Sequence, residues 1–180
     1  MARGYMGKLL DVDLSTGKVR VERLPQALCR QFLGGYGLGA KLLYDRMKPG
    51  TDALGPENLL GFFTGPLTGS PAIEGNRFMV VCKSPLTGTW GDANCGGTFG
   101  PALKFAGYDG ILFRGIAERP VYLAIQDGKP ELRDAGGGAS AGDGGGGGER
   151  ETCLTPPSLG RSAALERTLD TSTHTSSFAR

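Results

Sequence analysis

The chain of 180 residues has room for one domain, or for one domain with a tail, and its hydrophobic content of 39% supplies a modest core. Its formal net charge of +2 is too small and too evenly spread to predict nucleic-acid binding, and no apolar run approaches the length of a membrane span. The first residues contain no apolar signal-peptide segment, so we expect a cytoplasmic protein.

The first elements predicted along the chain form a β-hairpin. Apolar and polar residues alternate through residues 10–14 and again through residues 18–22. Between these two segments, Ser15-Thr16-Gly17 places a glycine where a three-residue hairpin loop needs a positive φ.

Two helices are predicted next. Residues 25–32 follow a helical apolar pattern, which Gly34-Gly35 ends. A second pattern, in which Leu38 and Leu42 are four residues apart, ends before Pro49.

Beyond these helices the sequence is typical of a β-sheet. Asp127-Gly128 is a good turn between the last two predicted strands, and residues 101–106 predict a short helix with proline at its first position. Residues 1–135 are therefore predicted to form an α+β domain that is dominated by a β-sheet and has few, short helices. The further strands are expected at residues 59–63, 78–83, 111–114, 121–125 and 131–133.

The composition changes abruptly at Ala135. Residues 136–180 begin with glycine runs and continue with a sequence rich in Ser, Thr, Arg and Gly. Such a segment buries too little apolar surface to offset the entropy lost on ordering it. We predict a disordered or artefactual tail, with a flexible linker as the alternative.

The four cysteines and the single histidine do not predict a metal site. Cys29, Cys82, Cys95 and Cys153 are far apart and form no C-x-x-C element, which zinc and iron–sulfur sites usually contain. His174 lies in the polar tail without companion ligands. We expect reduced thiols and a solvated histidine.

Three glycine-rich corners punctuate the domain. The first, residues 35–40, formally matches the dinucleotide-binding pattern G-x-G-x-x-[GA], but that site needs a strand before it. Because a helical segment precedes it here, we interpret it as a tight link between two helices. The second corner, residues 65–69, has a near-copy at residues 84–88. Both contain Pro-Leu-Thr-Gly, which is typical of a turn at a strand end.

The third corner, residues 91–100, has the composition of an anion- or cofactor-binding loop. It lacks the Gly-Lys-Ser/Thr ending of a nucleoside-triphosphate loop. Glycines let a ligand approach the backbone closely, and successive amides beside a helix start form a concavity for an anion. Arg77, just before a predicted strand, would supply a planar cation suited to a phosphate. A plain glycine-rich loop is the alternative.

A series of sequence blocks follows one order and spacing along the chain. It begins with Gly34-Gly35-Tyr36-Gly37-Leu38-Gly39-Ala40-Lys41 and includes Thr64-Gly65-Pro66-Leu67-Thr68-Gly69. The series resembles the N-terminal domain of the tungsten-containing aldehyde ferredoxin oxidoreductases, over residues 4–135 nearly without gaps. The other blocks are residues 54–60, 76–78, 83–88, 94–97, 103–110, 120–123 and 131–135.

The resemblance implies a fold and a function. In that family the N-terminal domain is a β-sheet base for a tungsten bis-pyranopterin, and two further, mostly helical domains cover it and supply a [4Fe–4S] cluster. The family oxidises an aldehyde to a carboxylic acid and passes electrons to ferredoxin, while the protein positions the cofactor and tunes its electrostatics. The sequence does not distinguish tungsten from molybdenum, and the resemblance allows a homodimer.

The resemblance also implies cofactor-binding residues. The family's pterin contacts match Arg77, which suits a phosphate, Asn94, a paired donor and acceptor, and Gly96, which allows close backbone approach. Gly97 completes this block. Cys95 stands where we expect serine or another small residue, and we interpret it as a filler, with a spare thiol near the metal as the alternative. No residue of this chain is predicted to be catalytic or to bind the metal.

The sequence departs from the family after Ala135. The family continues with helical sequence, an arginine- and glycine-rich segment that contacts the second pterin, and the cluster cysteines, none of which follows here. We therefore expect a truncated or frameshifted reading frame whose product is inactive alone. The alternatives are a short paralogue that binds pterin without turnover and a non-functional gene fragment.

Overall fold

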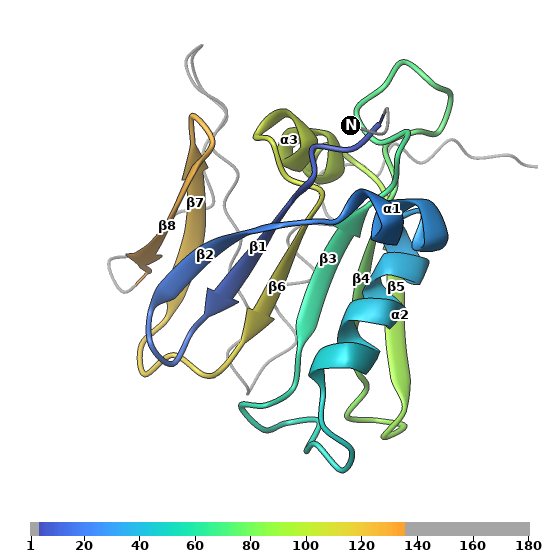
Figure 1. The fold of residues 1–180 in the computed structure, drawn as a ribbon. Coiled ribbons are helices and arrows are strands. Elements are labelled where there is room, and N and C mark those ends of the chain that lie inside the picture. Colours follow the sequence, from blue (N-terminus) through green and yellow to red (C-terminus); the bar gives the residue numbers. More distant parts are fainter. Residues whose placement is uncertain (1–3, 136–180) are drawn as a thin grey trace, which may run out of the picture.

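The computed structural model describes residues 4–135, which are built around one six-stranded β-sheet of order β2-β1-β6-β3-β4-β5 (Figure 1). A separate two-stranded sheet pairs β7 with β8. The strands are β1 (Lys8–Asp13), β2 (Lys18–Arg23), β3 (Leu60–Thr64), β4 (Phe78–Lys83), β5 (Trp90–Cys95), β6 (Gly110–Arg114), β7 (Val121–Gln126) and β8 (Lys129–Asp134). The helices of this part of the chain are α1 (Gln26–Phe32), α2 (Gly35–Arg46) and α3 (Phe99–Phe105).

The strands of the large sheet are mostly antiparallel. The exception is the contact between β1 and β6, which run parallel and pair Leu9 with Gly110. The N-terminal hairpin of β1 and β2 is thereby joined to β6, which comes much later in the chain. β2 and β5 form the two edges of the sheet.

One face of the sheet is covered by α2, which lies over β3 and β4, while α1 packs against α2 (Figure 1). Gly39 permits this close approach, because a Cβ at that position would lie 2.9 Å from Val81 Cγ2 and 3.1 Å from Phe63 Cδ2. The buried core on this face consists of Leu9, Leu24, Cys29, Leu38, Leu42, Leu43, Leu59, Phe63, Val81 and Leu112.

The opposite face of the sheet is covered by α3 and the β7–β8 hairpin. Side chains alternate between the two faces along each strand, so Leu10 and Ile111 belong to this second core although their neighbours Leu9 and Leu112 belong to the first. The Phe99 ring of α3 meets other phenylalanine rings edge to face. The buried residues on this face are Leu10, Val12, Leu103, Tyr108, Ile111, Phe113, Leu123 and Ile125.

A buried ion pair fastens the N-terminal segment to the end of the sheet. Lys104 Nζ lies 2.5 Å from Asp109 Oδ1 and donates a hydrogen bond to the Gly4 carbonyl at 2.7 Å. The Asp109 carboxylate accepts hydrogen bonds from the Met6 and Gly7 amides at 3.1 and 2.6 Å. The segment before β1 is therefore held between α3 and β6.

The predicted α+β class and the predicted strands are confirmed, but one strand was missed. Residues 90–95, predicted to lie in a glycine-rich loop, form β5, which pairs with β4 along its whole length. The predicted short helix is present, but it begins at Phe99, so Pro101 is its third residue and not its first.

The interpretation of residues 35–40 as a link between helices is wrong. These residues form the first turns of α2, and the link consists of Leu33 and Gly34, which have φ values of 58° and 147°. A Cβ at Gly34 would lie 2.7 Å from the Thr64 carbonyl oxygen. Glycine there lets the helix junction approach the end of β3 closely.

The predicted disordered tail, residues 136–180 with Cys153 and His174, lies outside the described residues. The longest helix within residues 4–135 is α2, with 12 residues. None of the helices in that range has both the length and the apolar character that a membrane crossing requires.

Candidate cofactor-binding site

Arg77 and Asn94 are brought together by the register of two adjacent strands. Arg77 immediately precedes β4, and Asn94 lies near the end of β5, where Phe78 pairs with Cys95. The Arg77 Nη1 group donates a hydrogen bond of 3.3 Å to Asn94 Oδ1. Both side chains are exposed.

The guanidinium of Arg77 is not neutralised by a carboxylate of the described residues. Glu74, three residues earlier in the chain, is the obvious candidate for an ion pair, but residues 4–135 form none with Arg77. Because guanidinium carries five N–H groups and one contacts Asn94, donors remain to bind an anion.

Gly96 and Gly97 form the loop that leaves β5 and leads to α3. Gly97 has a φ of 87°, in the left-handed region that favours glycine. A Cβ built on either residue would meet no atom within 4 Å. Within the described part of the chain, the Gly96 and Gly97 N–H groups have no hydrogen-bond acceptor. This stretch of backbone is therefore open to a ligand beside Arg77.

Cys95 lies between Asn94 and the glycine pair and is half-buried. Burial raises the pKa of its thiol above the ordinary value, and the charge of Arg77 opposes this increase only in part. The thiol therefore stays protonated at neutral pH, which is unfavourable for a nucleophile or a metal ligand. Its Sγ atom contacts the Ala93 carbonyl oxygen at 3.9 Å. The interpretation of Cys95 as a filler stays a prediction.

The described thiols do not converge on one point. Cys29 is buried in α1 beneath one face of the sheet, while Cys82 and Cys95 lie on β4 and β5. Cys95 pairs with Phe78, four residues before Cys82, so these two thiols are separated by about 13 Å along the strand direction. Within residues 4–135, no group of three His, Cys, Asp or Glu side chains is arranged to hold a metal ion.

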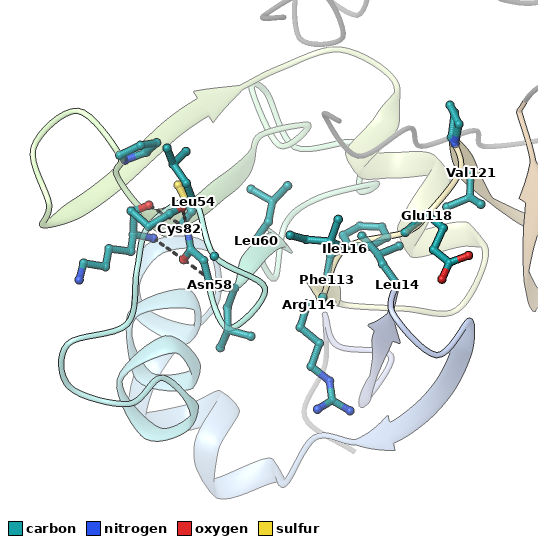
Figure 2. Close-up of a pocket in the computed structure, with 18 of the residues that line it drawn as sticks. Leu14, Leu54, Asn58, Leu60, Cys82, Phe113, Arg114, Ile116, Glu118 and Val121 are labelled. Atoms are coloured by element: carbon teal, nitrogen blue, oxygen red, sulfur yellow. Dashed lines mark hydrogen bonds between the residues drawn. The ribbon is translucent and has the colours of Figure 1, made fainter. Parts of the chain in front are cut away.

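A second feature, which the sequence did not predict, is an open apolar hollow of about 480 Å³ (Figure 2). It is lined from the sheet by Leu60, Cys82 and Phe113 and from the loop after β6 by Ile116. It lies toward the Lys83 end of β4, whereas Arg77 adjoins the opposite end. The hollow is therefore separate from the Arg77 site.

The hollow brings few chemically active groups together. Arg114 at its edge is paired with Asp11 and Asp13, at 3.5 and 3.4 Å. The Asn58 amide connects its own loop to the end of β4 by donating to the Ala53 and Lys83 carbonyl oxygens, at 2.7 and 3.0 Å (Figure 2). The exposed cation, amide and glycine loop at the other end of β4 are better suited to a charged ligand.

Comparison with known proteins identifies the family. A family model described as "Aldehyde ferredoxin oxidoreductase, N-terminal domain" matches residues 9–147. The chain belongs to this family. The predicted resemblance to aldehyde ferredoxin oxidoreductases is thereby confirmed, while the roles of Arg77, Asn94, Cys95, Gly96 and Gly97 in cofactor binding stay predictions.

Relatives in the family differ in the substrates for which they are named. The chain is 48% identical over 132 residues to a tungsten-containing aldehyde ferredoxin oxidoreductase of Pyrococcus abyssi, a match that covers 73% of this chain and 22% of that protein. It is 43% identical over 134 residues to the WOR-like subunit of an aliphatic sulfonate oxidoreductase of Pyrococcus furiosus, covering 73% and 21%. The chain thus spans about a fifth of the length of these relatives.

A solved structure confirms the fold assignment. The active-site complex of a benzoyl-coenzyme A reductase, bound to 1,5-dienoyl-CoA, matches this chain with a TM-score of 0.73 and 41% sequence identity. The match covers 75% of this chain and 21% of the chain in that complex. Proteins that are similar to this domain are therefore named for an aldehyde, an aliphatic sulfonate and benzoyl-coenzyme A.

Proposed function

We propose that this domain is the cofactor-binding base of a tungsten-pterin oxidoreductase, and that Arg77, Asn94 and the Gly96-Gly97 loop hold a pterin phosphate. The observation that carries the proposal is the hydrogen bond between Arg77 and Asn94 beside a stretch of open glycine backbone. A cation, an amide and free backbone N–H groups together are suited to a phosphate monoester and to the polar edge of a pterin ring.

The residues present fit this part of the cofactor. The Arg77 guanidinium is exposed and has no carboxylate partner in the described residues, so a phosphate does not need to displace an existing ion pair. The Gly96 and Gly97 backbone leaves more than 4 Å of free space where a side chain would project. Any larger residue would occupy the space from which the ligand approaches.

The role of this chain's own residues is to bind and orient. When bound, the tungsten-pterin group supplies two-electron redox chemistry. Arg77 neutralises phosphate charge, Asn94 keeps the guanidinium in place through its Oδ1 atom, and the glycine loop limits the distance between ligand and backbone. Burial raises the pKa of the Cys95 thiol, so this residue of the corner is a poor general base at neutral pH.

We propose aldehyde oxidation with ferredoxin as acceptor as the reaction of the whole protein. In that reaction an aldehyde and water give a carboxylic acid, two protons and two electrons, and a [4Fe–4S] cluster passes the electrons to ferredoxin. The support is the 48% identity to a relative named for this activity. Since relatives named for a sulfonate and a thioester share the domain, we place substrate selection in other parts of the protein.

The test is a binding titration with the 180-residue chain. The probe is the phosphate ester of 6-hydroxymethylpterin, followed by its own fluorescence anisotropy, and unphosphorylated 6-hydroxymethylpterin serves as the reference. Arg77→Gln should weaken binding of the ester about tenfold or more, because a charge-assisted hydrogen bond contributes about 1.5–3 kcal/mol. It should leave the weaker binding of the unphosphorylated pterin unchanged.

Arg20→Gln is the matched control. Arg20 is also exposed, but it lies on the edge strand β2, four strand positions and about 19 Å from β4 by strand spacing. If Arg77→Gln and Arg20→Gln bind the phosphate ester equally well, the proposed role of Arg77 is wrong.

A further inference from the structure

Two turns of nearly identical sequence have different surroundings. Residues 65–69 and 84–88 share Pro-Leu-Thr-Gly, and the final glycines both have positive φ values, 79° at Gly69 and 68° at Gly88. The hydroxyl of Thr87 in the second turn is exposed and contacts the Thr89 hydroxyl at 3.0 Å. Thr68, its counterpart in the first turn, is only 6% exposed.

The buried hydroxyl of Thr68 connects its own turn to the backbone of Arg77. Thr68 Oγ1 accepts a hydrogen bond from the Gly65 amide at 2.9 Å and donates one to the Arg77 carbonyl oxygen at 2.8 Å. Its methyl group lies close to the start of α3, where a Cβ at Gly100 would be 3.0 Å from Thr68 Cγ2. One side chain thus contacts the turn after β3, the residue before β4 and the helix after the glycine loop.

The turn that carries Thr68 is itself held in place from several sides. A Cβ at Gly4 would lie 2.5 Å from the Pro66 carbonyl oxygen, and Gly69 lies against Lys104 and Phe105 of α3. The preceding Thr64 donates from its amide and its hydroxyl to the Asp109 carbonyl oxygen, at 2.9 and 2.8 Å. Displacement of the Thr68 hydroxyl would therefore require movement of buried neighbours.

We infer that Thr68 is a positioning residue for Arg77. By fixing the Arg77 carbonyl oxygen, the Thr68 hydroxyl sets the direction in which the arginine side chain leaves the backbone just before β4, so that its guanidinium meets Asn94 on the side of the glycine loop. The inference rests on the proposed function only for its consequence in ligand binding. The geometric part concerns the free protein and is tested without a ligand.

The test compares Thr68→Val, which removes the hydroxyl but keeps the shape, with Thr68→Ser, which keeps the hydroxyl. Thr87→Val is the matched control, because it makes the same change in the turn of nearly identical sequence at residues 84–88. NMR spectra of the free chains report the Arg77 Nε–H and Asn94 side-chain amide signals. Thr68→Val should shift both signals, whereas Thr68→Ser and Thr87→Val should leave them at their wild-type positions.

Binding of the phosphate ester of 6-hydroxymethylpterin supplies the second measurement. Thr68→Val should weaken it about fivefold or more, the factor that corresponds to one neutral hydrogen bond, and Thr68→Ser should restore it. A thermal unfolding midpoint that falls while the Arg77 and Asn94 signals and the affinity stay at wild-type values would show that Thr68 is merely structural, which overturns the inference.

The failures of the two proposals are distinguishable. If Arg77→Gln does not weaken binding but Thr68→Val shifts the Arg77 signal, the ligand assignment fails and the positioning role stands. If Arg77→Gln weakens binding and Thr68→Val changes neither the signals nor the affinity, the positioning role fails. Should Thr68→Val not fold, the wild-type hydroxyl proton of Thr68 must exchange slowly and show a nuclear Overhauser effect to the Phe78 amide. Its rapid exchange with water would overturn the inference.

Discussion

Replacement of Asp109 by asparagine should destabilise this domain strongly. The side chains of Asp109 and Lys104 are only 2% and 3% exposed. The Asp109 carboxylate also accepts hydrogen bonds from the Met6 and Gly7 amides. Asparagine keeps the size of the side chain but loses the charge, and it presents an N–H group to neighbours that are themselves donors. Removing one partner of a buried pair leaves the other charge uncompensated and costs about 3–5 kcal/mol.

A double-mutant cycle distinguishes the loss of the ion pair from a general destabilisation of the fold. Lys104→Met removes the other charge and leaves a buried carboxylate, so it should also cost about 3–5 kcal/mol. In the double variant no uncompensated charge remains, and its cost should fall below the sum of the single costs by roughly 1–3 kcal/mol. Lys41→Met is the control, because its pair with Asp45 is solvent-exposed and contributes about 0.5 kcal/mol.

Urea unfolding measures these free energies, followed by the fluorescence of Trp90, the single tryptophan, and by circular dichroism. The reasoning fails if each single variant loses less than about 1 kcal/mol, the size of an ordinary substitution. It fails equally if the two single costs add in the double variant, because the two charges would then be independent.

Four further outcomes are expected. Gly39→Val should lower the free energy of unfolding by about 1–3 kcal/mol through overpacking against Phe63 and Val81, whereas the exposed control Ala40→Val should cost about 0.5 kcal/mol, both measured by urea unfolding. Burial raises the pKa of Asp13, but amide hydrogen bonds from the following turn and a nearby guanidinium lower it overall. Asp13→Ala should therefore cost about 0.5–1.5 kcal/mol at pH 7 and progressively less as the pH falls below the ordinary carboxyl value of 3.8. Iron analysis after reconstitution of the 180-residue chain with iron and sulfide should find no stoichiometric [4Fe–4S] cluster, because such a cluster needs about four converging thiolates, and a viologen-coupled assay should find no aldehyde oxidation. In a full-length relative that carries an arginine at the position of Arg77, the alanine variant of that arginine should retain less tungsten and pterin after purification, because a guanidinium–phosphate pair is lost.

The strands that the sequence predicted share one property. Each contains an apolar run or an alternation of apolar and polar residues. β5 was missed because Trp90-Gly91-Asp92-Ala93-Asn94-Cys95 contains residues that are unfavourable in strands. These residues are extended because they pair with β4 along six positions, and as an edge strand they bury little. Such a strand is specified by its neighbour more than by its own composition.

The candidate site also depends on contacts between residues that are far apart in the sequence. Arg77 and Asn94 are 17 positions apart, and only the antiparallel register of β4 and β5 places them within hydrogen-bond distance. The sequence identified these residues through the family resemblance and the general chemistry of arginine and glycine. The near-copy turns at residues 65–69 and 84–88 contain no local sequence signal that distinguishes Thr68 from Thr87, although one hydroxyl is buried against Arg77 and the other is exposed.

We propose that the position of the Arg77 corner in the sheet lets one domain serve relatives named for different substrates. The Arg77 corner lies where β4 and the edge strand β5 meet the loop to α3, so one side of the corner is fixed by the sheet and the other is open. The fixed side includes the Thr68 hydroxyl, which donates a hydrogen bond to the Arg77 carbonyl oxygen, and the turn that carries it, which packs against Lys104. Groups that recognise an aldehyde, a sulfonate or a thioester can approach from the open side without altering those contacts. In the proposed function, substrate specificity can therefore change among these relatives while the geometry of the Arg77 corner stays the same.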